Sequence, residues 1–181
     1  CLMSYIDAAM VGKLGSAQAA SVGLVSSSTW IFSSLCYANN SGFSVQIAHK
    51  CGAKDYNGAR SILKKGLLCV LAISAVFLTI GLLIGRQLPG FLGGSEEIAG
   101  DAAAYFLIYA LFLPTFQIAV FAEGALIASG NLKVPSITSL AMCGLDVVFN
   151  YIFIFGWGPV EAMGGVGAAY GTLAAFCTGF V

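Results

Sequence analysis

The sequence predicts an all-α fold, a polytopic membrane helix bundle with about six transmembrane helices. Of its 181 residues, 59% are hydrophobic and 9% are charged, against about 25% charged residues in a typical soluble domain. The mean hydropathy is +0.91. The apolar segments lack the alternation and the roughly 10-residue length of β-barrel strands. Because a chain that crosses lipid must satisfy its own backbone hydrogen bonds, these segments are expected to be helices.

Charges and turn residues divide the chain into six predicted helices. The first ends at Gly12, and a polar stretch from His49 to Arg60 separates the second from the third. A turn region from Arg86 to Ser95 follows the third. Pro135 suits the first turn of the fifth helix, where no backbone N–H is needed. The predicted helices cover residues 1–11, 17–46, 62–85, 97–128, 135–157 and a last segment from about 165. Both chain ends fall inside apolar runs, which predicts a fragment of a longer protein with its first and last helices cut.

The distribution of lysine and arginine predicts the orientation in the membrane, because cytoplasmic loops carry an excess of both. The loops that follow the second and fourth predicted helices, with their flanks, hold Lys50, Lys54, Arg60, Lys64, Lys65 and Lys133. The opposite loops hold only Lys13 and Arg86. We therefore expect a multi-pass protein of the cell (plasma or inner) membrane, surrounded by the lipid bilayer, with the two basic loops in the cytoplasm.

Composition and motifs argue against several functions. The net charge is zero, which gives no electrostatic basis for nucleic-acid binding. The six cysteines lie mostly in apolar segments without a Cys-x-x-Cys pair, so neither a metal site nor a disulfide framework is expected. No P-loop sequence is present, so ATP is not the visible energy source. We expect neither enzyme activity nor a cofactor.

Asp146 is the most informative residue, since a carboxylate in the middle of a spanning segment costs at least about 2.5–3.5 kcal/mol on insertion scales. Asn150 follows four residues later, so the two side chains lie on one face of the predicted helix. Intramembrane acids usually face a protein interior or a water-filled path and handle ions or protons. The pair is a candidate cation or proton site, with a structural hydrogen bond between helices as the alternative. Asp7 is a second candidate carboxylate, with an interfacial carboxylate or the N-cap of the next element as the alternative.

Polar and aromatic residues of the second and fourth predicted helices are candidates for a substrate cavity. Glu123 shares a helix face with several aromatic side chains, an arrangement that attracts flat organic cations by stacking and cation–π interaction. Ordinary packing, with an interfacial glutamate, is the alternative, and the amides are alternatively contacts between helices. The candidate cavity residues are Tyr37, Asn39, Tyr109, Gln117 and Glu123.

Gly167 and Gly171, with Ala168 and Ala175 beside them, form a small-residue face in the last predicted helix. Such a face allows two membrane helices to approach closely. We expect it to serve packing only.

Three segments carry a family resemblance by their order and spacing. Tyr5 to Gly15 is similar to the end of a first helix and its outer loop, and Gln46 to Arg60 is similar to a cytoplasmic Gln-x-x-Gly-Ala loop. Gly130 to Thr172, with Leu145-Asp146 and Asn150-Tyr151, is similar to a fourth-loop, fifth-helix and sixth-helix signature. Together they resemble the multidrug and toxic compound extrusion (MATE) family of cation-coupled antiporters across nearly the whole chain.

The resemblance implies that residues 1–181 form part of the N-terminal lobe of a twelve-helix transporter. Such transporters export organic cations or drugs in exchange for H⁺ or Na⁺ by alternating access. The implied partners are a small organic cation and the C-terminal lobe of the same chain. The resemblance gives the central ion-binding carboxylate to Asp7. Family members often carry Asn and then Asp one turn apart on the fifth helix, whereas here Asp146 precedes Asn150.

Two other functions remain as alternatives. A lipid-linked oligosaccharide flippase of the same superfamily tends to need more cationic cavity residues for pyrophosphate, and the spans show none. An intramembrane aspartyl protease would use Asp7 and Asp146, but the Tyr-Asp and Gly-x-Gly-Asp contexts of that class are absent around them.

Overall fold

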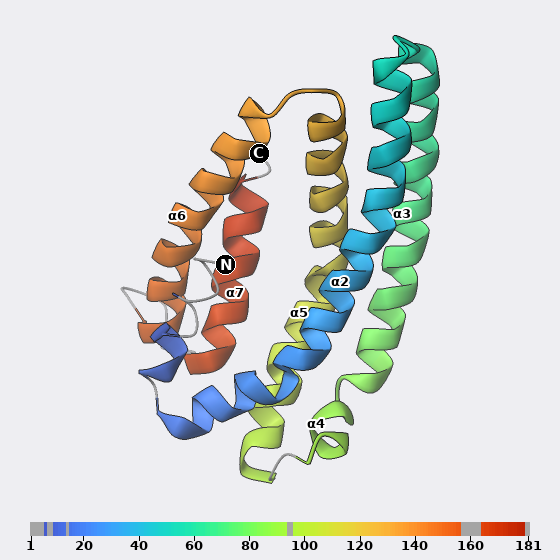
Figure 1. Cartoon of the computed structure of the whole chain (residues 1–181). Helices are drawn as coiled ribbons and strands as arrows, with labels where there is room; N and C mark the ends of the chain where they lie inside the picture. Colours follow the sequence, from blue (N-terminus) through green and yellow to red (C-terminus); the bar gives the residue numbers. More distant parts are fainter. Residues whose placement is uncertain (1–5, 7–8, 14, 94–95, 157–163, 180–181) are drawn as a thin grey trace.

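The structure, a computed structural model, describes residues 6, 9–13, 15–93, 96–156 and 164–179. These residues contain no strand, which confirms the predicted all-α fold. The helices of the described residues from 16 onward are α2 (Ser16–Gly52), α3 (Tyr56–Ile84), α4 (Leu88–Phe91), α5 (Glu96–Ala128), α6 (Lys133–Phe155) and α7 (Gly164–Gly179). The long helices run up and down, with the α2–α3 and α5–α6 turns at one end and α4 at the other (Figure 1).

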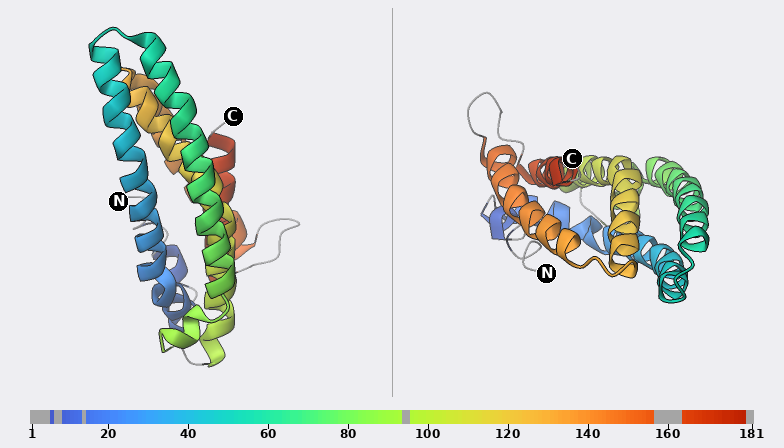
Figure 2. Two further views of the ribbon diagram at one scale, coloured as in Figure 1. Left: turned by 90° about the vertical axis from the view of Figure 1, so that its right-hand side faces the viewer. Right: turned by 90° about the horizontal axis from the view of Figure 1, so that it is seen from above.

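α5 is the central helix of the described bundle. It contacts α2 and α3 on one side and α7 on the other. In its most apolar part 44% of the residues are buried, against 17–22% in the corresponding parts of α2, α3 and α6. α6 packs mainly on α7, so α6 and α7 form a pair beside the α2, α3 and α5 group (Figure 2).

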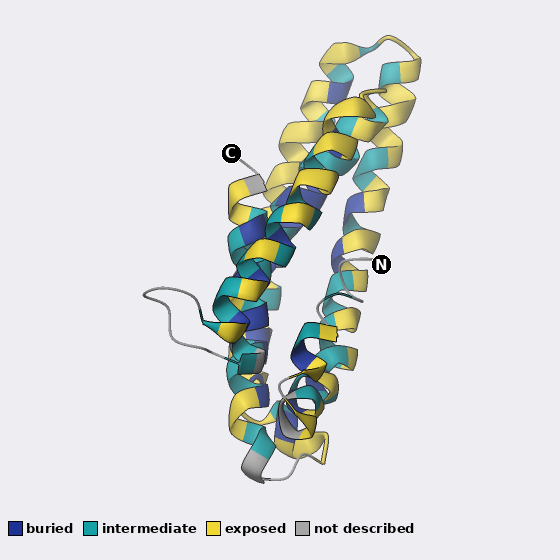
Figure 3. Ribbon diagram, turned by 90° about the vertical axis from the view of Figure 1, so that its left-hand side faces the viewer, coloured by how far each residue is buried: buried dark blue, intermediate teal, exposed yellow. Residues whose placement is uncertain are grey.

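The outer surfaces of the long helices are apolar and exposed. Buried positions follow the faces between helices, and exposed positions cover the outside (Figure 3). On α3, Leu68 and Leu83 are 69% and 71% exposed. Apolar side chains turned outward on a helix that satisfies its own backbone are expected for a lipid surround.

Four described helices, α2, α3, α5 and α6, are long and apolar enough to cross a membrane. α7 contains a shorter apolar stretch, Val166–Thr178. The first predicted helix is described only at residues 6 and 9–13. The structure confirms a polytopic helical membrane protein and accounts for four of the roughly six predicted spans by length.

The turn between α2 and α3 is much shorter than the predicted loop from His49 to Arg60, and that prediction is wrong. α2 continues to Gly52 and α3 begins at Tyr56, which leaves only residues 53–55 for the turn. Polar residues end an apolar span without ending the helix, because a helix that extends out of the lipid still satisfies its own backbone. Lys54 adopts a left-handed backbone, with φ of 58°, and reverses the chain.

Two proline positions define other helix starts. Pro135 lies in the first turn of α6, as predicted. Pro89 lies in the first turn of α4, a one-turn helix inside the predicted turn region of residues 86–95. Proline is tolerated at both because the first turn of a helix makes no use of its N–H groups.

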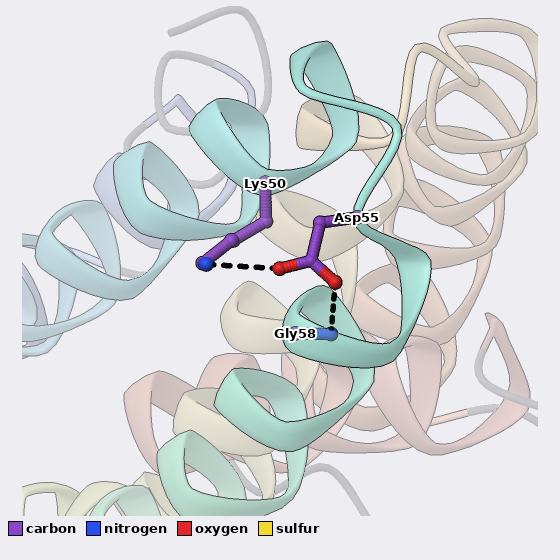
Figure 4. A network of polar contacts seen from close by, with 3 residues as sticks. All are labelled: Lys50, Asp55 and Gly58. Carbon is purple, nitrogen blue, oxygen red and sulfur yellow. Dashed lines mark hydrogen bonds and ion pairs between the residues drawn. The ribbon is translucent and has the colours of Figure 1, made fainter.

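Asp55 fixes the start of α3 (Figure 4). Its carboxylate accepts a hydrogen bond from the Gly58 backbone N–H over 2.9 Å and an ion-paired hydrogen bond from Lys50 Nζ over 2.9 Å. The Lys50 side chain and the Gly58 N–H hold the pKa of Asp55 below its ordinary value of 3.8. The carboxylate therefore joins the end of α2 to the beginning of α3.

Replacing Asp55 by alanine is expected to lower the thermal unfolding temperature, because α3 loses its N-cap and Lys50 loses its partner. Since the folded-state pKa is the lower one, the charge of Asp55 stabilises the fold above pH 3.8 and ceases to do so as the pH falls through the folded-state value. Asp55→Asn keeps an oxygen for the cap and removes the charge. Thermal melts at neutral pH should rank wild type, Asp55→Asn and Asp55→Ala in falling order; equal melting of all three would contradict the capping role.

Candidate functional site

Asp146 and Asn150 lie on one face of α6, as predicted, and both side chains are fully buried. Asn150 Nδ2 donates a hydrogen bond to Asp146 Oδ2 over 3.0 Å. Because α6 extends from Lys133 to Phe155, Asp146 lies about 20 Å and 14 Å along the axis from its two ends. Asp146 is the one fully buried acid among the described side chains, and it sits in the middle of a spanning helix.

α7 packs against this part of α6 through Gly167 and Gly171. A Cβ atom at Gly171 would lie 2.8 Å from the backbone nitrogen of Asn150 and would overlap its side-chain oxygen. A Cβ atom at Gly167 would lie 2.7 Å from the carbonyl carbon of Phe153. Only glycine permits such an approach between backbones. The predicted small-residue packing face is confirmed, and its partner is the part of α6 that carries Asn150.

The first segment of the chain reaches the same side of the bundle. Val11 packs with Ile154 of α6 and Ala168 of α7 in one buried apolar cluster. Ile154 follows Asn150 by one helical turn, so the cluster adjoins the buried polar pair. Asp7 lies outside the described residues, and its part in the site stays a prediction.

Glu123 lies near the α5–α6 turn and connects these two helices. Its Oε1 accepts a hydrogen bond from Ser139 Oγ of α6 over 3.3 Å. Two helical turns earlier on the same face of α5, Phe116 contacts the ring of Tyr37, which belongs to α2. The carboxylate is half-buried. It is therefore accessible enough to meet a ligand while it remains tied to α6.

Two other predicted cavity residues lie in the contact between α2 and α5. The Tyr109 hydroxyl is 2.6 Å from Ser33 Oγ and donates to the Thr29 carbonyl over 3.1 Å. Gln117 is fully buried, and its backbone carbonyl accepts a hydrogen bond from Asn40 Nδ2 over 3.4 Å. In this structure Tyr109 and Gln117 hold α5 to α2.

Tyr37 and Asn39 differ in their surroundings. Tyr37 is 54% exposed, and its ring meets Phe116 edge-on with 5.8 Å between centroids. Phe116 also packs against Phe176 of α7 at 5.6 Å. Asn39 is half-buried. Part of the aromatic stripe on α5 therefore serves helix packing, and Tyr37 remains accessible near Glu123.

The candidate residues thus form two groups. Asp146 and Asn150 are a buried carboxylate–amide pair on the face of α6 that meets α7. The candidate substrate-binding residues lie along the contact between α2 and α5. Glu123 lies between the two groups. A carboxylate bonded to an amide inside a membrane span provides oxygen atoms for a proton or a small cation. An exposed tyrosine near a carboxylate attracts a larger organic cation.

Comparisons with known proteins bear on the family and the fold of the chain. A protein-family model described as MatE matches residues 1–152. The chain is similar to a probable multidrug resistance protein NorM of Listeria monocytogenes, with 26% identity over 175 residues, 94% of this chain and 37% of that protein. It is similar to an FAD transporter of Shewanella oneidensis, with 22% identity over 170 residues, 94% of this chain and 38% of that protein. A crystal structure of MATE in complex with MaD3S superposes with a TM-score of 0.91 at 25% identity, over 99% of this chain and 39% of that one. The chain spans less than two fifths of the length of these relatives.

Proposed function

The chain belongs to the MatE family, and on this premise we propose that it is part of a cation-coupled antiporter that exports organic cations by alternating access. The observation that carries the proposal is the Asp146–Asn150 pair, buried in the middle of a spanning helix. This pair, together with Asp7, binds the coupling ion, either H⁺ or Na⁺. The C-terminal lobe that the resemblance implies completes the transport path.

Ion binding acts through the charge of Asp146. An ionised carboxylate at this depth is costly, and H⁺ or Na⁺ neutralises it. The neutral site favours a conformation closed to water, and release of the ion favours one in which water reaches the site. The ion shifts this equilibrium only by the difference between its affinities for the two conformations. The ion gradient thereby drives the conformational cycle.

The substrate is proposed to be an organic cation. Tyr37 provides an accessible aromatic ring that contacts Phe116, and Glu123 provides a carboxylate two turns further along the same face of α5, which suits a flat cation. The basic residues of the described helices are exposed and lie toward the helix ends. That placement does not suit an anionic cargo such as FAD or the pyrophosphate of a flippase substrate. Members of the family are transporters, so the protease alternative is set aside and the chain is not an enzyme.

Flux measurements in proteoliposomes that contain the full-length transporter test this function. We expect a fluorescent organic cation such as ethidium to be moved against its gradient when an opposing H⁺ or Na⁺ gradient is imposed. Each gradient is applied in a separate experiment, because either ion fits the site. An empty-vesicle control gives the passive leak. The proposal would be contradicted if neither ion gradient changed the ethidium flux, or if the protein transported FAD but not ethidium.

A further inference from the structure

The α2–α3 turn carries a concentrated positive charge at the outermost point of its end of the bundle. It extends beyond the α5–α6 turn in both side views (Figures 1 and 2). In residues 50–65 the one acid is Asp55, and it is already paired with Lys50. The cations of this segment, all of them exposed, are Lys50, Lys54, Arg60, Lys64 and Lys65. The turn therefore presents four positive charges that Asp55 does not neutralise.

Two of these cations share one face of α3 with lipid-facing side chains. Tyr56, Arg60 and Lys64 follow one another at intervals of four residues and lie on one face of the helix. The same face continues downward with Leu68 and Leu71, which are 69% and 42% exposed, and Tyr56 at its top is 68% exposed. An aromatic ring and two cations thus stand directly above exposed leucines.

The order of side chains along this face, cations first and exposed leucines next, matches the order of headgroups and acyl chains in a lipid. Lys64 is one helical turn, about 6 Å along the axis, from Leu68. Tyrosine is enriched at the level of the headgroups in membrane proteins. Lysine and arginine near the surface are attracted to anionic lipids. A phospholipid whose phosphate lies at the level of Arg60 and Lys64 would have its acyl chains along the leucines.

We propose that this surface, the basic face formed by Tyr56, Arg60 and Lys64 of α3, binds the headgroup phosphate of an anionic phospholipid such as phosphatidylglycerol. The Arg60 guanidinium donates two N–H groups to the phosphate oxygens, and Lys64 adds a second positive charge. The continuity of the basic face with exposed leucines favours a lipid over a soluble partner, which would meet the charges without the apolar surface below them. This inference does not depend on what the protein transports.

Native mass spectrometry of the purified full-length protein tests the basic face. Phosphatidylglycerol is compared with phosphatidylcholine of the same acyl chains. The variant Arg60→Gln/Lys64→Gln is expected to bind phosphatidylglycerol about 25-fold more weakly, at roughly fivefold per cation removed. Phosphatidylcholine binding should not change. High salt should weaken phosphatidylglycerol binding to the wild type, because exposed charges are screened.

Two further variants control for folding and for location. Arg60→Lys keeps the charge and should weaken binding by clearly less than the roughly fivefold expected for the loss of one cation. Lys13→Gln/Arg86→Gln removes two exposed cations outside the α2–α3 turn and should bind phosphatidylglycerol as the wild type does. Equal binding of both lipids by the wild type would overturn the proposal. So would an equal loss of phosphatidylglycerol binding in the Lys13→Gln/Arg86→Gln protein, since that result indicates attraction to net charge alone.

Discussion

Replacing Asp146 by asparagine in the full-length transporter is expected to reduce strongly the transport driven by the ion gradient while leaving the protein folded. The amide keeps an oxygen that accepts the hydrogen bond from Asn150 Nδ2, which spans 3.0 Å in the native pair, and it removes the charge that binds the ion. The loss of coupling should be between about five- and 150-fold, the usual range of coupling between two sites. The unfolding temperature should stay the same or rise, because a neutral amide is cheaper to bury than a carboxylate.

The choice of asparagine separates ion binding from a structural hydrogen bond. If Asp146 served packing alone, Asp146→Asn would transport normally and Asp146→Leu, which removes the acceptor, would be the defective and unstable variant. Asp101→Asn removes an exposed acid at the start of α5 and is the matched control for net charge. Gradient-driven flux in vesicles is the measurement. Wild-type flux in Asp146→Asn would rule out Asp146 as a coupling residue.

Replacing Gly171 by alanine is expected to separate α6 from α7 and to destabilise the protein by about 1–3 kcal/mol. The added Cβ would lie 2.8 Å from the backbone nitrogen and 2.9 Å from the Cα of Asn150. Backbone atoms of a helix cannot turn aside as a side chain can, so α7 has to move as a whole. The movement also removes the α7 backbone from its place beside Asn150, so transport should fall together with stability. Thermal melting of the full-length protein in detergent measures the first effect and ethidium flux the second.

Gly144 provides the control for Gly171. It lies within α6 two residues before Asp146, and a Cβ atom there would meet nothing within 4 Å. Gly144→Ala should leave the unfolding temperature unchanged or raise it, because alanine favours a helix by about 1 kcal/mol over glycine. Gly167→Ala, which crowds the Phe153 backbone, should behave like Gly171→Ala. If all three alanine variants melt alike, the close contact between α6 and α7 is not what requires glycine.

The parts of the fold that follow from composition and period were predictable from the sequence. These parts are the apolar spans, the shared face of Asp146 and Asn150, and the small-residue face of α7. Each depends on the spacing of residues along one helix, and this spacing can be read from the sequence. The length of the α2–α3 turn was not predictable in this way. It depends on a left-handed Lys54 and on the cap formed by Asp55, whereas the polar residues around them are equally compatible with a loop.

Partners between helices were the other part that the sequence did not reveal. Ser33 and Thr29 bond to Tyr109, yet α2 is rich in serine, and nothing in the sequence distinguishes Ser33 from its neighbours. Gln117 is buried against α2 although its amide alone suggested a cavity. The bond from Ser139 to Glu123 joins α6 to α5 across a turn. Such pairs depend on how two helices face each other, which spacing along one helix does not define.

A comparison of two fluxes in the same vesicles tests most directly whether Asp146 binds the coupling ion. One flux is the transport of ethidium driven by an H⁺ or Na⁺ gradient, and the other is the exchange of labelled for unlabelled ethidium with no ion gradient. Asp146→Asn is predicted to lose the first flux and keep the second, since the substitution does not change Tyr37 and Glu123, the residues proposed to bind the substrate. Retention of both fluxes, or an equal loss of both, would contradict an ion-binding role for Asp146.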